Sequence, residues 1–159
     1  MTVHRRPEER KSDGKSLRKA VPRSSHGDWS PAADRPDPVD VITSQDTDRV
    51  QPLVPIRHGR MAVSPFTFYR GAAKIMAEDL SSTPSSGLDA QLCGDAHLAN
   101  FGSYASPDRR QVFDVNDFDE TLPGPWEWDL KRLATSFVLA GRDNGFDKAA
   151  ITAATTRSV

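Results

Sequence analysis

The chain reads QLCGDAHLANFGSYASPDRRQVFDVNDFDETLPGPWEWDL over residues 91–130, and this stretch decides the fold. QVFDV at residues 111–115 predicts a strand, which we expect to be buried, and the alternation of Leu88, Ala90 and Leu92 predicts a short strand upstream. The segment between the two strands is too polar to be simple core. We therefore expect short strands that flank a loop with chemical function.

Helical patterns lie on both sides of these strands. Large apolar residues recur at helical spacing over residues 66–80, and SSTPSSG at 81–87 stops the pattern with its proline and glycine. A second helix is predicted from about residue 126 to 140, and a further helical pattern starts at residue 146 without a convincing stop. The order of elements predicts an α+β fold, and the abrupt end suggests a truncated chain.

The first 40 residues differ from the rest in composition. Residues 1–60 carry 12 Lys and Arg against 9 Asp and Glu, and they hold 7 of the 12 prolines but few large apolar side chains. Such a segment cannot bury enough apolar surface to offset the entropy of ordering. We expect residues 1–40 to be a disordered, proline- and charge-rich leader, and residues 41–159 to be the ordered part.

Composition excludes several classes of protein. The single cysteine excludes an internal disulfide framework and a cysteine-based structural zinc site. No stretch of about 18 apolar residues exists, so we expect no membrane span. The N-terminus lacks the apolar segment of a secretory signal. The net charge of −1 gives no case for a nucleic-acid partner.

Carboxylates are dense after the second predicted strand. Six acids lie between Asp114 and Asp129 with no Lys or Arg among them. Converging carboxylates repel one another unless a cation lies between them, and such oxygen-rich sites suit magnesium, manganese or calcium. The alternative is that these side chains are solvated or cap the next helix. Asp129 falls in the first turn of that helix, so we expect it to be structural.

The segment around Asp95 is more specific. Gly94 allows a tight backbone path before Asp95, and Asn100 follows five positions later. Phosphotransferases of the protein-kinase type use such a pair: the aspartate orients the attacking hydroxyl, and the asparagine binds magnesium. A second aspartate after a later strand completes their metal site. Here it would be Asp117, 22 residues after Asp95, with Asp119 and Asp114 as substitutes.

The order strand, Gly-Asp, His, Asn, strand, Asp-Phe-Asp and Asp-Leu helix is similar to the aminoglycoside-phosphotransferase and choline-kinase branch of the kinase-like fold. The resemblance implies a partial kinase-like fold in which Asp95 is catalytic and His97 organises the loop. The 12 positions from Asp117 to Asp129 favour Asp117 over Asp114 as the metal aspartate. Where that branch usually has histidine, this chain has Cys93, which we expect to be a small buried side chain. The implied magnesium ligands are Asn100, Asp117 and Asp119.

A closer resemblance covers about residues 37–159. RHGRMAVSPFTFYRGAAKIMAEDL at 57–80 and the run from 91 to 140 strongly resemble a bacterial family catalogued as domain of unknown function 2252. The resemblance implies a cytoplasmic protein normally several hundred residues long, of which this chain would be the N-terminal part. The family name supplies no activity.

A kinase-like enzyme also needs a cation for the nucleotide phosphates, and usually a glycine-rich cover. Neither the G-x-G-x-x-G pattern nor the G-x-x-x-x-G-K pattern is present. Arg60, Arg70 and Lys74 are the nearby upstream cations, and Arg70 and Lys74 are the candidates for binding phosphate. The competing interpretation of each is a surface or structural ion pair.

Three functions stay open at this point. The first is a phosphotransferase that uses Mg²⁺ and ATP and acts on a small-molecule or protein hydroxyl. The second is a metal-dependent phosphohydrolase that uses Asp95, His97 and the acids after the second strand. The third is a binding module or inactive fragment without catalysis.

Overall fold

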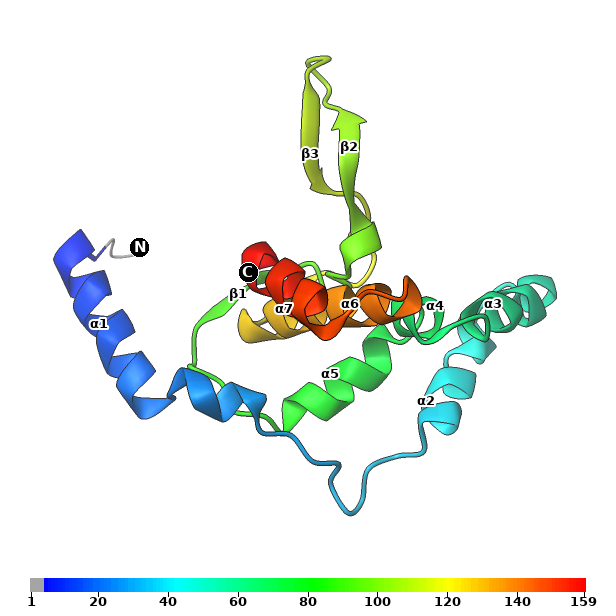
Figure 1. The fold of residues 1–159 in the computed structure, drawn as a ribbon, viewed down its shortest axis with the longest axis horizontal. Coiled ribbons are helices and arrows are strands. Elements are labelled where there is room, and N and C mark those ends of the chain that lie inside the picture. Colours follow the sequence, from blue (N-terminus) through cyan, green and yellow to red (C-terminus); the bar gives the residue numbers. More distant parts are fainter. Residues whose placement is uncertain (1–4) are drawn as a thin grey trace.

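The structure, a computed structural model, describes residues 5–159 and has an α+β fold (Figure 1). This confirms the predicted fold class. The α-helices are α1 (Pro7–Ala20), α2 (Pro38–Ser44), α3 (Val54–Met61), α4 (Pro65–Arg70), α5 (Ala73–Ser81), α6 (Glu127–Asp143) and α7 (Lys148–Ser158). The strands are β1 (Asp89–Leu92), β2 (Phe101–Ala105), β3 (Gln111–Val115) and β4 (Leu122–Pro125), and the short 3₁₀ turns are η1 (Arg23–Gly27), η2 (Asp46–Asp48), η3 (Gln51–Leu53) and η4 (Leu98–Asn100).

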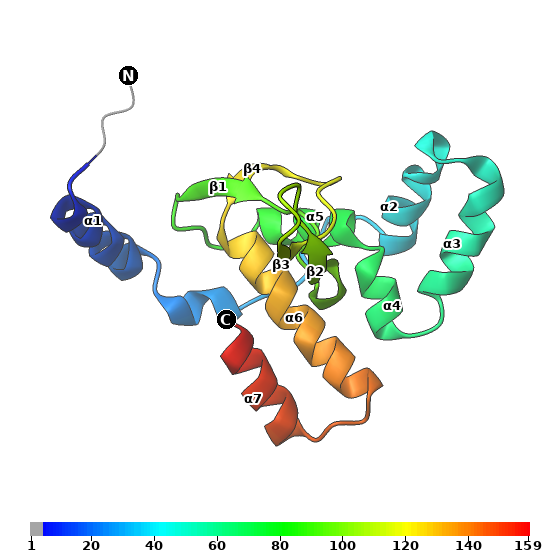
Figure 2. The ribbon, with the colours of Figure 1, turned by 90° about the horizontal axis from the view of Figure 1, so that it is seen from above.

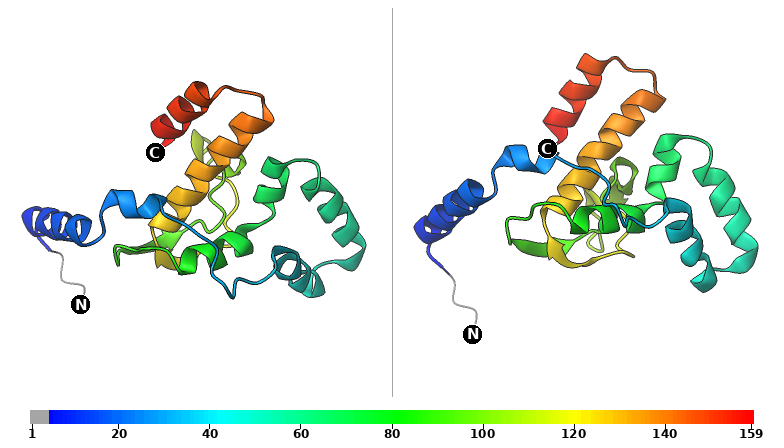
Figure 3. Two further views of the ribbon diagram at one scale, coloured as in Figure 1. Left: turned by 60° about the horizontal axis from the view of Figure 1, so that its bottom comes forward. Right: turned by 90° about the horizontal axis from the view of Figure 1, so that it is seen from below.

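Helix α6 is the central element on which the others are arranged. Helix α7 lies alongside it, and α4 and α5 also contact it (Figures 2 and 3). A side chain at Gly141 would place its Cβ 2.6 Å from Cγ1 of Ile151, so the missing side chain lets α6 and α7 approach closely. Helices α2, α3 and α5 share a small apolar core of Ile42, Met61 and Ala72, with Ile75 packed against it.

The strands form two separate antiparallel pairs. Strand β1 pairs with β4, and β2 pairs with β3, in register from Phe101 opposite Val115 to Ala105 opposite Gln111. The β2–β3 hairpin projects away from the helices (Figure 1), and Phe113 on β3 is 72% exposed. The predicted strand at 111–115 is therefore confirmed, but the expectation that it is buried is wrong, because no second layer covers the hairpin among the described residues.

The helix predicted over residues 66–80 is broken into α4 and α5 at Gly71 and Ala72. Arg57 on α3 donates a hydrogen bond from Nη2 to the Gly71 carbonyl oxygen at 2.7 Å. The Met61 side chain fills the space beside Gly71, where a Cβ would lie 2.6 Å from Sδ. Contacts from α3 thus hold the chain in a non-helical turn that the apolar pattern of the segment does not reveal.

The structure is also helical in part of the segment for which composition predicts a disordered leader. Helix α1 begins after Arg6, whose backbone N–H and guanidinium donate hydrogen bonds to the Glu9 carboxylate, and Pro7 occupies its first position. Acids in the first turn and bases in the last turn match the helix dipole. No residue of α1 is buried, so this helix depends on local interactions that overall composition does not register.

Across the described residues, none of the helices combines the length and the apolar character needed to cross a membrane.

Candidate active site

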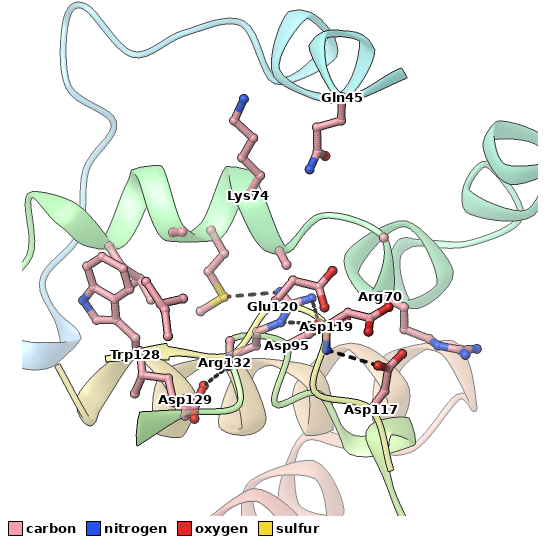
Figure 4. A pocket seen from close by; sticks show the side chains of 18 of the residues that line it. Gln45, Arg70, Lys74, Asp95, Asp117, Asp119, Glu120, Trp128, Asp129 and Arg132 are labelled. Carbon is pink, nitrogen blue, oxygen red and sulfur yellow. Dashed lines mark hydrogen bonds and ion pairs between the residues drawn. The ribbon is translucent and has the colours of Figure 1, made fainter. Parts of the chain in front are cut away.

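A cleft of about 470 Å³ lies between the helical segment α3–α5 and the loops that follow β1 and β3 (Figure 4). Residues from α6 form its floor. Most of the cations that line it come from the helical side, and most of the acids come from the two loops. The cations of the helical side are Arg49, Arg57, Arg70 and Lys74, a fifth cation, Arg132, comes from α6, and the loop acids are Asp95, Asp117, Asp119 and Glu120.

Helix α6 holds the loop after β1 through hydrogen bonds to the backbone of that loop. The Asp129 carboxylate accepts hydrogen bonds from the backbone N–H groups of Cys93 at 2.7 Å and Gly94 at 3.0 Å. Gly94 has a φ of +80°, and a side chain there would lie inside contact distance of the Glu120 carbonyl oxygen. Glycine therefore lets the loop after β1 touch the loop after β3, and the predicted structural role of Asp129 is confirmed.

Arg132, also on α6, holds the side chain of Asp95. Its Nε donates to Asp95 Oδ1 at 2.7 Å, and its Nη2 donates to the same oxygen. Nη2 also donates to the Tyr69 carbonyl oxygen at 3.0 Å, and the guanidinium carbon lies 4.5 Å from the centre of the Tyr69 ring. Arg132 is only 2% exposed, so this is a buried ion pair that fixes one carboxylate oxygen of Asp95.

The sequence analysis missed Arg132. It follows Asp129 by three residues on the predicted helix, and residues at this spacing lie on the same helix face. That spacing was the available signal, because a residue on the face that holds Asp129 also faces the loop after β1.

His97 lies behind Asp95 and does not line the cleft. Its Nε2 is 3.6 Å from Asp95 Oδ2, and its ring is buried. Burial lowers the pKa of His97, and although Asp95 opposes this shift, the nearby charges of Arg132 and Arg70 add to it. The ring is therefore neutral at pH 7, and it packs against the loop rather than facing the cleft.

Asn100 joins the two loops. Its Nδ2 donates to the backbone carbonyl oxygens of Asp95 and Asp117, each at 3.1 Å. These two acceptors fix the orientation of the amide, so Oδ1 is the atom left for any other partner. Asn100 is buried in the layer behind the cleft wall. Cys93 lies against the same amide and is buried, as predicted, and burial raises the pKa of its thiol.

The predicted metal aspartates Asp117 and Asp119 both line the cleft (Figure 4). The Asp119 backbone N–H donates to Asp117 Oδ1 at 3.2 Å. Burial raises the pKa of the neighbouring Glu120, and the charges of Asp95, Asp117 and Asp119 raise it further. Asp114 lies on β3 and does not line the cleft.

These acids lie near one another without forming a closed cage. Within residues 5–159, no group of three or more His, Cys, Asp or Glu side chains is placed to surround one metal ion. A magnesium ion that arrives with a phosphate group needs only one or two protein carboxylates, since phosphate oxygens and water complete its octahedron. Asp117 and Asp119 fit that kind of site.

The helical wall carries the two predicted phosphate ligands and two further cations. Arg70 is exposed at the end of α4, and Lys74 on α5 donates from Nζ to Ser44 Oγ at 3.1 Å. Arg49 and Arg57, which the sequence analysis did not select, lie on the same wall. In the described part of the chain, none of these four cations forms an ion pair.

A family model described as "Uncharacterized protein conserved in bacteria (DUF2252)" matches residues 49–159. The chain belongs to this family. The match includes the residues that line the cleft from Arg49 to Arg132, whereas Gln45 and the helices α1 and α2 of this DUF2252 chain precede it. Comparison with curated proteins and with solved structures found no match.

The DUF2252 cleft has an unusual distribution of charge. Four cations without ion pairs line one wall, and Asp117, Asp119 and Glu120, also without ion pairs, line the other. The only carboxylate in the cleft with an arginine partner among the described residues is Asp95. A ligand that carries anionic oxygens and a divalent cation would neutralise both walls at once.

Proposed function

We propose that this DUF2252 domain is a phosphotransferase that moves a phosphoryl group from ATP, with Mg²⁺, to a hydroxyl group of a small molecule or protein. The observation that carries the proposal is the two-walled cleft, in which unpaired cations face the unpaired carboxylates Asp117, Asp119 and Glu120, and which Asp95, paired with Arg132, also lines. A magnesium–polyphosphate complex has the charges that such a cleft requires.

The residues divide into two groups in this proposal. Arg70 and Lys74 contact the phosphates from the helical wall. Asp117 holds magnesium with Asp119 as a further oxygen donor, while Asn100, behind the cleft wall, joins the two loops that carry Asp95 and Asp117. When bound, magnesium supplies positive charge that neutralises the phosphate oxygens as the transfer proceeds.

Asp95 orients the hydroxyl group that receives the phosphoryl group. Arg132 occupies Oδ1 and leaves Oδ2, beside His97, as the oxygen that accepts a hydrogen bond from this hydroxyl. Phosphoryl transfer proceeds through a loose transition state, so catalysis depends mainly on positioning and on charge stabilisation. A carboxylate fixed by a buried arginine suits positioning.

The alternative of a two-metal phosphohydrolase has less support. That mechanism uses metal ions about 3.5–4 Å apart, which need a dense set of protein ligands. The described residues contain no such set, and His97, the histidine nearest the acids, does not line the cleft.

Binding of MgATP to the purified protein, measured by calorimetry, tests the nucleotide site. We expect Asp117→Asn to weaken MgATP binding at least about tenfold, which corresponds to about 1.4 kcal/mol. Asp114→Asn is the matched control, since it removes a nearby carboxylate outside the cleft, and should leave affinity unchanged. No binding at millimolar nucleotide, or equal affinity of the two variants, would contradict the proposal.

Transfer itself is tested by ADP production in the presence of a panel of hydroxyl compounds and proteins. Asp95→Asn should abolish turnover and keep MgATP binding, because the amide oxygen can still accept from Arg132. Binding without turnover in the wild-type protein would instead support a binding module. Release of phosphate from simple phosphate esters without ATP would support a hydrolase.

A further inference from the structure

Arg57 differs from the other cations of the cleft in how firmly it is held. Its Nη2 donates to the Gly71 carbonyl oxygen at 2.7 Å, at the break between α4 and α5. Arg70 and Lys74 are exposed, and Arg49 is exposed as well. One hydrogen bond therefore anchors the Arg57 guanidinium in the wall of the cleft, whereas the exposed side chains retain more freedom.

Arg57 also has an unsatisfied donor. Its Nη1 is buried and has no hydrogen-bond partner among the described residues. Buried donors without partners are rare, because each loses its hydration without a replacement. The Arg57 guanidinium in the wall of the cleft therefore keeps one donor for which the described residues supply no acceptor.

No carboxylate of the described chain forms an ion pair with Arg49 or Arg57, although the negative charges of Asp46 and Glu120 act on Arg57 from a distance. Asp48 directly precedes Arg49 in the sequence but forms no ion pair with it among the described residues, and Asp46 pairs with His58 at 3.0 Å. Burial lowers the pKa of Arg57, and the positive charge of Arg49 lowers it further. Two like charges that lack an ion-pair partner favour an anion from outside the chain.

The chemistry of the groups indicates the class of that anion. Guanidinium groups bind phosphate oxygens through paired hydrogen bonds, and they do so best when the arginine is already held in place. Glu120, on the opposite wall, partly opposes the lowered pKa of Arg57 by its negative charge. A polyphosphate that carries a divalent metal would contact the arginines with its oxygens and the acids with its metal.

We infer that Arg57, with Arg49 beside it, binds the polyphosphate of the nucleotide and takes the place of the phosphate-binding lysine of kinase-like enzymes. The inference rests on the proposed function in assigning the polyphosphate to a nucleotide. The anion site itself rests on the anchored guanidinium, its unsatisfied donor and the adjacent like charge.

Inorganic tripolyphosphate and ATP, each with and without Mg²⁺, are the probes, and calorimetry on the full chain is the measurement. We expect Arg57→Gln to weaken binding of both probes at least about tenfold, and Arg49→Gln to weaken it about threefold to tenfold. Arg60→Gln is the matched control, because Arg60 lies on the same helix and does not line the cleft. It should change affinity less than twofold.

Equal affinities of the Arg57→Gln and Arg60→Gln proteins would overturn the inference. Thermal unfolding shows whether the Arg57→Gln protein is folded. If it is not folded, the Arg49→Gln protein is the test of the anion site. Unchanged tripolyphosphate affinity in the Arg49→Gln protein would then overturn the inference. The two proposals fail separately. ATP turnover that depends on Asp95 and persists in Arg57→Gln would refute the subsite alone, whereas Arg57-dependent tripolyphosphate binding without turnover would refute the transferase alone.

Discussion

Arg132 on α6 and Asp95 in the loop after β1 form a buried ion pair, with Nε 2.7 Å from Oδ1. The guanidinium also contacts the Tyr69 ring and the Tyr69 carbonyl oxygen, so it has partners on several sides. Burial raises the pKa of Tyr69 to about 12, and its protonated hydroxyl donates to the Arg132 carbonyl oxygen at 3.0 Å. The pair thus connects the loop after β1, α4 and α6.

Arg132→Met should destabilise the protein by about 3–5 kcal/mol, because it leaves the Asp95 carboxylate without its partner in a largely buried site. The double variant with Asp95→Asn should be less destabilised than the sum of the single changes. Urea denaturation of the four proteins measures this coupling. Arg70→Met, which removes an exposed and unpaired arginine, should stay within about 0.5 kcal/mol. If Arg132→Met lowers the free energy of unfolding as little as Arg70→Met does, the ion pair does not stabilise the fold.

Asn100→Ala should cost about 1–3 kcal/mol, since it removes the donor shared by the carbonyl oxygens of Asp95 and Asp117. Asn116→Ala is the control, because Asn116 is exposed and its side chain makes no hydrogen bond among the described residues. Chemical denaturation of both variants is the measurement. Equal stabilities would mean that the Asn100 amide does not hold the two loops together.

Gly94→Ala should be more destabilising than Gly87→Ala, although both glycines have a positive φ, +80° and +76°. The backbone strain, about 1–2 kcal/mol, is common to both substitutions. Only at Gly94 does the new methyl group meet another segment, the carbonyl of Glu120, which adds about 1–3 kcal/mol. The difference between the two denaturation midpoints isolates the contact between the loops, and no difference would indicate that the loops can separate freely.

Glu120→Gln should stabilise the protein near pH 7 by up to about 0.5 kcal/mol, a small value because the side chain is partly exposed. The raised pKa of Glu120 means that the folded state keeps this proton to a higher pH than the unfolded state. Its contribution to stability is therefore lost as the pH rises above the ordinary value of 4.5. In denaturation curves measured at a series of pH values, the stability difference between variant and wild type should therefore grow as the pH rises above 4.5. A constant difference would show that Glu120 is not repelled by its neighbours.

Local patterns predicted most of the elements around the site. The predicted strand at 111–115 coincides with β3, and the helix expected from about 126 to 140 corresponds to α6. The break at Gly71 escaped prediction because it depends on Arg57 and Met61, side chains from another helix. Helix α1 was not predicted because the hydrogen bonds from Arg6 to Glu9 at its start are a local feature, which overall composition does not reveal.

The sequence predicted some residues of the candidate site correctly and not others, again because tertiary packing decides which side chains face the cleft. Spacing along one segment selected Asp95, Asp117 and Asp119, and all three line the cleft. Asn100 and His97 match the same spacing, but their side chains lie behind the wall. Spacing within a loop predicts which residues are close, and it does not predict which side of the loop they face.

Arg49 and Arg57, the two cleft arginines that the sequence analysis did not select, lie more than 35 residues upstream of Asp95. The packing of α3, α4 and α5 places these two arginines across the cleft from the acids. No periodicity within either segment encodes that approach, so only the tertiary structure reveals the cation wall.

Asp129 and Arg132 stand one helical turn apart on α6 and hold the same loop, one through backbone amides and the other through the Asp95 carboxylate. The loop is therefore fixed to the helix at two points, so a substitution at either residue leaves the other attachment in place.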